Sequence, residues 1–256
     1  MSKRVHVFAV GLAFASAGCF GVSSTRADEI KLLSSGALHE ICDEALPAFE
    51  KASSHTVKVT FAGTVDIKKK IAAGEVYDLV IVGAPEVEAF IKGGKMKEGS
   101  RVNIAGSGVG VAVKAGAPKP DVGSAGGLKT ALLKAKAVVL STGPSGVYVL
   151  KMFEKLGVAD ELKSKSKQTV PGSRVGQYLA RGEADLGFQQ ISELIHEQGI
   201  DYIGPLPPEL QNVTLFSSGI GSGAASPAAA KALQAFMTSS DAAGIIKKNG
   251  MEPSAR

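Results

Sequence analysis

Two apolar segments near the start of the chain each lead into a short polar loop and then into an amphipathic segment. Residues 30–33 precede a Ser-Ser-Gly loop at 34–36, and residues 56–61 precede an Ala-Gly-Thr loop at 62–64. A loop of this kind delivers hydroxyl groups to a helix N-terminus, where backbone N–H groups lack partners and the helix dipole is positive. The pattern therefore favours a layered α/β fold and predicts anion-binding loops at the strand ends.

The same alternation of strands and helices continues to the end of the chain, which is typical of an α/β architecture with mainly parallel sheets. Further strands are predicted at 77–82, 101–113, 137–140, 167–170, 184–188 and 213–223. Helices are predicted at 37–53, 66–73, 86–91, 125–135, 147–156, 174–180, 227–238 and 241–248.

Two of these strands are long and rich in glycine, namely 101–113 and 213–223. Glycine-rich strands that bend are candidates for crossing between two lobes. We therefore predict a two-segment hinge, with residues 28–104 and 222–256 in lobe one and residues 105–221 in lobe two.

The N-terminal segment has the organisation of a secretory signal peptide. Lys3 and Arg4 precede an apolar run, and small residues follow it up to Ala27. The run is too short for a membrane-spanning helix, so we predict cleavage after Ala27 and a periplasmic mature protein. The alternative is a lipoprotein box at 16–19 with lipidation of Cys19.

Cleavage would remove three of the 29 basic residues and none of the 24 acidic ones, which leaves a mature net charge of about +2. The remaining lysines are dispersed and aromatic residues are few, so the composition argues against nucleic-acid binding. Cys42 becomes the only cysteine of the mature chain, which excludes an internal disulfide. Its helical, apolar surroundings predict a buried, inert thiol.

Sequence signatures of enzymes, cofactors and metals are poorly matched. The glycines at 106–110 lack dinucleotide-binding spacing, and no Gly-x-Ser-x-Gly elbow is present. His39 and His196 are each followed by glutamate but lack a second histidine one turn later, which excludes a zinc protease site. Asp78 and Asp185 are predicted inside strands. We expect no metal and no cofactor.

Several segments, in this order and spacing, resemble the extracytoplasmic molybdate-binding proteins of ABC importers. They lie at 32–37, 48–51, 59–64, 71–81, 181–187 and 226–233. The resemblance covers essentially the whole mature chain. It implies a two-lobe periplasmic-binding-protein fold of the second topological type, working as a monomer, with the ligand in the cleft between the lobes and loops from both sides closing on it.

Carried over to this sequence, the resemblance implies hydroxyl donors from lobe one and backbone N–H donors from lobe two. The expected ligand-binding residues are Ser34, Ser35, Gly63, Thr64, Thr142, Gly143, Ser145, Gly172, Ser173, Arg174 and Gln190. Either Ser34 or Ser35 would supply the first hydroxyl. Gln190 stands where molybdate-binding proteins usually have a tyrosine, which suggests a different or a larger anion.

The chemistry of these residues leaves the anion open. Neutral Ser, Thr and backbone donors suit a dehydrated tetrahedral oxyanion, whereas a carboxylate more often recruits an arginine such as Arg174. Each residue also has a structural interpretation. Ser35 and Thr64 could serve only as helix N-caps, and Arg174 could be a solvated residue in the first turn of its helix.

Three functions are consistent with this sequence. The favoured one is a solute receptor that captures a small anion and delivers it to a membrane permease. The second is a periplasmic isomerase of a small tricarboxylate, because aconitate isomerase is similar to these binding proteins, and its candidate catalytic groups here are His39, Tyr148 and Arg174. The third is a receptor that partners a sensor kinase.

Overall fold

The computed structural model describes residues 27–170 and 173–254. The predicted signal peptide, the alternative lipidation site at Cys19 and the predicted ligand residue Gly172 lie outside the described residues. No helix of the described part combines the length and apolar character that a membrane crossing requires.

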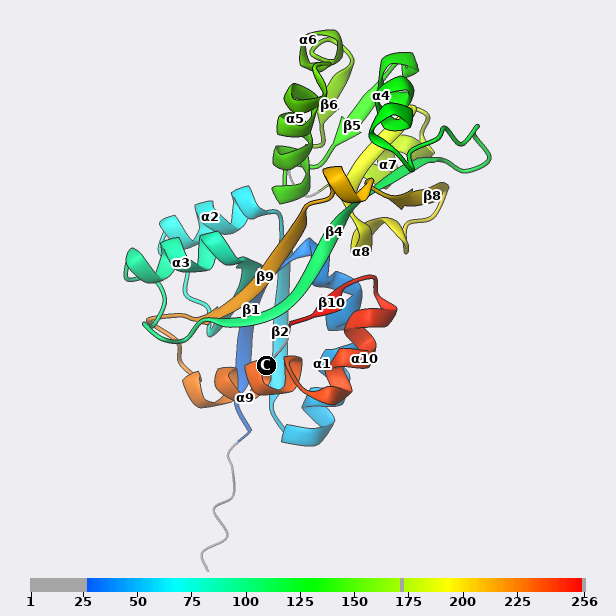
Figure 1. Cartoon of the computed structure of the whole chain (residues 1–256). Helices are drawn as coiled ribbons and strands as arrows, with labels where there is room; N and C mark the ends of the chain where they lie inside the picture. The colour runs from blue at the N-terminus through cyan, green and yellow to red at the C-terminus, as the bar shows by residue number, and fades with distance from the viewer. Residues whose placement is uncertain (1–26, 171–172, 255–256) are drawn as a thin grey trace, which may run out of the picture.

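The described chain forms two lobes, seen in Figure 1 as a lower and an upper group of strands flanked by helices. In the first lobe, three parallel strands lie in the order β2-β1-β3. They are β1 (Glu29–Ser35), β2 (Thr56–Ala62) and β3 (Leu79–Gly83). The helices of this lobe are η1 (Gly36–Leu38), α1 (His39–Ser53), α2 (Thr64–Ala72), α3 (Ala84–Lys92), α9 (Pro227–Met237) and α10 (Ser240–Lys248).

The second lobe repeats the arrangement with three parallel strands in the order β7-β5-β6. They are β5 (Val138–Leu140), β6 (Ser166–Gln168) and β7 (Leu186–Gln190). The helices of this lobe are α4 (Ala125–Lys134), α5 (Pro144–Leu156), α6 (Ala159–Leu162), α7 (Val175–Ala180), α8 (Ile191–Leu194) and η2 (Pro208–Leu210).

Two long strands connect the lobes, as the two glycine-rich segments predicted. Residues 102–108 of β4 (Val102–Lys114) pair antiparallel with β9 (Val213–Ile220), which also pairs with β3. From residue 109 onward, β4 pairs instead with β7 and with β8 (Ile200–Pro205). One continuous strand therefore belongs to the sheets of both lobes. The exact lobe boundaries stay a prediction.

Glycine in β4 allows neighbouring side chains to pack directly on the strand. A Cβ atom at Gly110 would lie 2.7 Å from the ring of Tyr202, closer than carbon atoms approach one another. Tyr202 belongs to β8, which the sequence analysis missed together with the short elements α6, α8 and β10 (Glu252–Pro253).

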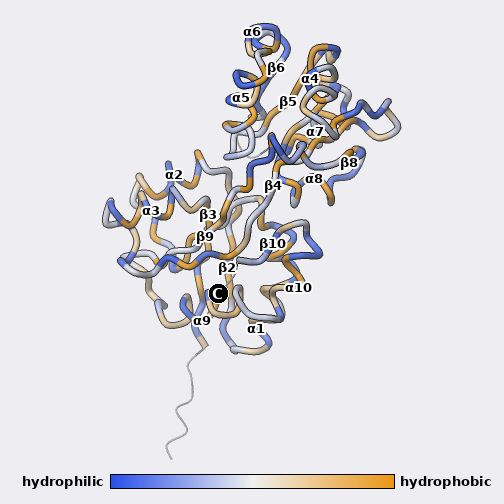
Figure 2. The backbone as a smooth tube through the Cα atoms, viewed as in Figure 1, coloured by the Kyte–Doolittle hydropathy of each residue, from blue (hydrophilic) through white to orange (hydrophobic). Residues whose placement is uncertain are grey.

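Apolar residues cover both faces of each parallel sheet at its inner strands, which explains why β3 and β5 read as continuous apolar runs while the edge strands β2 and β6 do not. In the first lobe, Leu32 and Ile81 pack with α1, α9 and α10, whereas Leu33 and Val80 pack with α2 and α3 on the other face. The strands form the hydrophobic interior of the trace in Figure 2. Cys42 is fully buried on the first of these faces, and burial raises the pKa of its thiol to about 12, so the prediction of a buried, inert thiol is confirmed.

An aspartate lies immediately before one parallel strand in each lobe, and its carboxylate accepts hydrogen bonds from backbone N–H groups of neighbouring segments. Asp78 accepts hydrogen bonds from the backbone N–H groups of Lys31 in β1 and Ser226 before α9, both at 2.8 Å. Asp185 accepts from the N–H groups of Lys136 and Ala137 at 2.6 and 3.2 Å. Both aspartates precede their strands, β3 and β7, rather than lying inside them as predicted.

The two aspartates give a matched test of this hydrogen-bonding role. Asp78→Ala should lower the free energy of unfolding by about 2 to 4 kcal/mol, because it leaves two backbone donors unpaired at a site only 3% exposed. Asp185→Ala, at an exposed site, should cost about 1 kcal/mol. Urea denaturation of both variants checks this expectation, and equal losses would contradict it.

Candidate ligand-binding site between the lobes

A polar cavity of about 290 Å³ lies where the loops after β1 and β2 meet those after β5, β6 and β7. The carboxyl ends of parallel strands meet at one edge of each sheet, which is where open α/β sheets bind ligands. Nine of the predicted ligand residues line this cavity: Ser35, Gly63, Thr64, Thr142, Gly143, Ser145, Ser173, Arg174 and Gln190.

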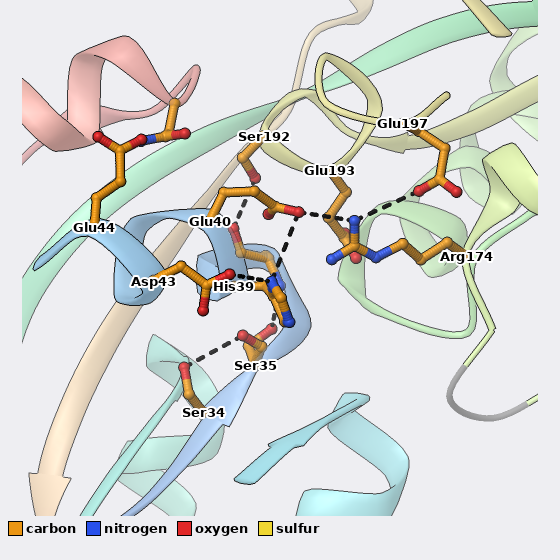
Figure 3. A network of polar contacts seen from close by, with 12 residues as sticks. Ser34, Ser35, His39, Glu40, Asp43, Glu44, Arg174, Ser192, Glu193 and Glu197 are labelled. Carbon is orange, nitrogen blue, oxygen red and sulfur yellow. Dashed lines mark hydrogen bonds and ion pairs between the residues drawn. The ribbon is translucent and has the colours of Figure 1, made fainter. Parts of the chain in front are cut away.

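Ser34 does not line the cavity. Its side chain is fully buried, and its hydroxyl donates to the carbonyl of Ser35 at 3.3 Å (Figure 3). Ser35 lines the cavity and also accepts a long hydrogen bond, 3.4 Å, from the N–H of Ala37 as the N-cap of η1. Of the two serines, the geometry places only Ser35 within reach of a ligand.

Two helices begin at the cavity with a glycine as the N-cap residue, and in α5 the Ser141 hydroxyl accepts a hydrogen bond of 3.2 Å from the N–H of Gly146 in the first turn. Gly63 is the N-cap of α2 and Gly143 is the N-cap of α5, and neither can supply a side-chain acceptor. Helix α2 begins at Thr64, two residues before its predicted start. Helix α5 begins at Pro144, three residues before its predicted start, because proline fits the first helical position. Thr64 is therefore not an N-cap, and both helix N-termini present partial positive charge to the cavity.

Two threonine hydroxyls lie buried in the cavity wall without a partner. The Oγ1 atoms of Thr64 and Thr169 have no hydrogen-bond partner among the described residues, and Thr169 is 3% exposed. A buried hydroxyl without a partner costs free energy. Both atoms are therefore available to a bound ligand. Ser145, by contrast, shares a hydrogen bond with Ser141, with 2.9 Å between the two Oγ atoms.

Gln190 lies at the floor of the cavity and connects it to the hinge strands. Its side-chain amide is 2.9 Å from Thr214 Oγ1 on β9. In the amide orientation that gives both the oxygen and the nitrogen a hydrogen-bond partner, the oxygen accepts from Thr214 Oγ1. The nitrogen then donates to the carbonyls of Ser107 and Gly108 on β4, at 3.0 and 3.2 Å. The residue that replaces the expected tyrosine is thus held by β4 and β9 as well as facing the cavity.

Arg174, the N-cap of α7, forms an ion pair between the lobes. Its Nη1 lies 2.8 Å from Glu40 Oε1, on α1 of the first lobe, and 3.5 Å from Glu197 Oε2 (Figure 3). Its side chain is one quarter exposed. The interpretation of Arg174 as a solvated residue is therefore wrong, and the guanidinium is the only arginine or lysine group among the described residues of the cavity lining.

Glu193, which the sequence analysis missed, lies in the cavity wall beside Arg174. Its Oε1 accepts a hydrogen bond of 2.8 Å from Nε2 of Gln189, whose own Oε1 accepts from the N–H of Val175 at 2.8 Å. Burial raises the pKa of Glu193 to about 7. Arg174 opposes this effect, while Glu40 and Glu197 add to it. A carboxyl group that titrates near neutral pH therefore faces the ligand space.

The three predicted catalytic candidates are only partly brought together. His39 lines the cavity, with its ring 4.3 Å from that of Phe61 and its Nδ1 3.3 Å from Asp43 Oδ2. Tyr148 instead packs on the second lobe and donates its hydroxyl to the carbonyl of Leu210 at 2.7 Å. No group of three His, Cys, Asp or Glu residues in the described part of the chain is arranged to hold a metal ion.

Comparison with known proteins agrees with this architecture. The sequence profile of the bacterial extracellular solute-binding proteins matches residues 30–252. The chain is 34% identical over 230 residues to an aconitate isomerase of Pseudomonas sp., covering 88% of this chain and 87% of that protein. It is 27% identical over 208 residues to the molybdate-binding protein ModA of Rhodobacter capsulatus, covering 79% of each. The periplasmic molybdate-binding protein of Azotobacter vinelandii superposes with a TM-score of 0.74 at 20% identity, covering 88% of this chain and all of that one.

The raised pKa of Glu193 makes stability depend on pH in a defined direction. The folded state binds this proton more tightly than the unfolded chain, so the stabilisation is complete below about pH 4.5 and is lost as pH rises through about 7. Glu193→Gln should therefore become more stable relative to the parent protein between pH 5 and 8. Denaturant midpoints at several pH values measure this difference.

Glu44 offers a matched control on the exposed side of α1. Hydrogen bonds from Lys248 and Asn249 lower the pKa of Glu44, so its contribution has the opposite sign and is lost only in acid. Glu44→Gln should not reproduce the gain above pH 5. A constant difference between Glu193→Gln and the parent protein would contradict the assignment.

Proposed function

The chain belongs to the bacterial extracellular solute-binding proteins, and on that premise we propose that it captures a small carboxylate anion in the cavity between its lobes and delivers it to the permease of an ABC importer. The family works outside the cytoplasmic membrane, which supports a periplasmic location. The observation that carries the proposal is the meeting of the N-termini of α2 and α5 in one cavity with the hydroxyls of Thr64 and Thr169, which have no hydrogen-bond partner among the described residues.

Two features favour a carboxylate over a tetrahedral oxyanion. Liquid water occupies about 30 Å³ per molecule, so a cavity of about 290 Å³ offers the space of roughly ten waters, more than one tetrahedral oxyanion fills. Arg174 adds a planar guanidinium, which matches the two oxygens of a carboxylate.

A second candidate is an isomerase that moves a proton within a small tricarboxylate. The carboxyl group of Glu193, whose pKa burial raises to about 7, and the imidazole of His39 both line the cavity that contains Arg174. A base beside an acidic C–H bond and a cation for the carboxylates are the groups that such a reaction needs. The 34% identity to an aconitate isomerase over 88% of the chain supports this candidate.

Ligand-induced stabilisation of the mature protein tests the proposed ligand class. Citrate, cis-aconitate or trans-aconitate should raise the thermal midpoint, because a ligand that binds only the folded state stabilises it by mass action. Molybdate, tungstate, sulfate and phosphate should not. Stabilisation by molybdate or tungstate but by no tricarboxylate would contradict the carboxylate proposal. Exchange of the methylene protons of bound aconitate in deuterated water, followed by NMR, then separates an isomerase from a receptor.

Valine substitutions test the two partnerless hydroxyls. Thr64→Val and Thr169→Val should each weaken binding of the stabilising ligand by about 1 to 3 kcal/mol, because each removes a donor to a charged group. Neither should lower the stability of the unliganded protein, because neither hydroxyl has a hydrogen-bond partner among the described residues. Thr130→Val, on the exposed side of α4, is the matched control and should leave affinity unchanged. Lost stability with unchanged affinity would assign both hydroxyls a structural role.

A further inference from the structure

The charges that meet at Arg174 do not balance. Glu40 from α1, Glu193 from α8 and Glu197 just beyond α8 all face this single guanidinium (Figure 3). His39 lies farther out, 3.8 Å from Glu40 Oε1, and is itself beside Asp43. With all three glutamates ionised, the cluster carries net negative charge at the wall of a cavity whose proposed ligand is an anion.

Glu193 differs from the other two glutamates in what holds it. Glu40 and Glu197 each place an oxygen near Nη1 of Arg174, at 2.8 and 3.5 Å. The Glu193 carboxylate instead accepts from the uncharged amide of Gln189 at 2.8 Å. It also lies against the backbone of Gly36, where a Cβ atom would be 3.6 Å from its Oε1. Among the described residues it therefore accepts one hydrogen bond, from a neutral donor, and forms no direct ion pair.

A proton on Glu193 would change both the charge and the hydrogen-bonding character of this wall. It removes one negative charge from the cluster and converts an acceptor-only carboxylate into an O–H donor. A carboxyl group in a buried, negatively charged setting accepts a proton readily, and the pKa of about 7 agrees with this geometry. An incoming carboxylate adds negative charge beside Glu193 and so favours its protonated form further.

We propose that Glu193 takes up a proton from solvent when the cavity captures a polycarboxylate anion, and that the protonated carboxyl group donates a hydrogen bond to that anion. The inference rests on the proposed function, since it requires an anionic ligand in this cavity. Proton uptake makes affinity fall by up to about tenfold for each pH unit above 7 and leaves it nearly constant well below 7.

Calorimetric titration in two buffers of different ionisation enthalpy counts the protons taken up. With trans-aconitate as the probe, the parent protein should take up about half a proton at pH 7, rising toward one at pH 8. Glu193→Gln should bind the same probe without the proton uptake seen in the parent protein. Its affinity should change less than twofold between pH 7 and 8.5. Comparison of the two proteins subtracts any proton carried by the probe itself.

Glu197→Gln is the matched variant, because Glu197 faces the same guanidinium. It should retain proton uptake. Loss of uptake in Glu197→Gln but not in Glu193→Gln, or zero uptake by the parent protein at pH 7 to 8, would overturn the inference. The parent measurement alone tests the inference even if a variant fails to fold.

If trans-aconitate does not bind while sulfate or molybdate does, the proposed ligand class is wrong. The same two-buffer comparison with that oxyanion then tests whether Glu193 takes up a proton.

Discussion

The hydrogen bonding of β4 to two different sets of strands is the constraint on which the rest of the structure depends. Its first half pairs with β9 and its second half with β7 and β8. A shift of this strand relative to one lobe would therefore disturb its backbone hydrogen bonds in the other lobe as well. Gln211 reinforces the point where the pairing changes, because its side-chain amide accepts from the N–H of Val109 at 2.8 Å and donates to the Val109 carbonyl at 3.0 Å. The position of the cavity follows, since this shared strand sets how the ligand loops of the two lobes face each other.

The groups that the cavity offers to an anion are mainly neutral. The N-termini of α2 and α5 supply partial positive charge, and hydroxyl groups supply donors, while the one guanidinium is already engaged by Glu40 of the first lobe. Since Glu40 and Arg174 belong to different lobes, the same ion pair joins the two walls of the cavity. A ligand that reached Arg174 would therefore meet one of the contacts between the lobes, beside the hydrogen bond from Ser192 to the carbonyl of Ala37.

Sequence reasoning located most of the cavity because strand ends and helix starts are local features. The loops at 34–36 and 62–64 were predicted from adjacent apolar and polar residues, and Ser35 and Thr64 line the cavity as that reasoning expected. Glu193 and Thr169 were missed because nothing in their neighbourhoods marks them. Glu193 could have been suspected only from its position just beyond a strand that ends at the ligand edge, three residues after Gln190. Short elements such as α8 lack the length for a periodic signal.

The sequence by itself determined the α/β class, the two glycine-rich crossing strands, the family resemblance and the buried character of Cys42, because each depends on local composition or on the order and spacing of segments along the chain. Tertiary structure alone decided which of Ser34 and Ser35 faces the cavity, that Tyr148 packs away from it, and that Arg174 is paired with Glu40. Those outcomes depend on contacts between residues more than a hundred positions apart, as for Glu40 and Arg174, or on the direction of a single side chain. The same holds for Glu193, whose pKa near 7 arises from burial and charges that only the folded chain assembles.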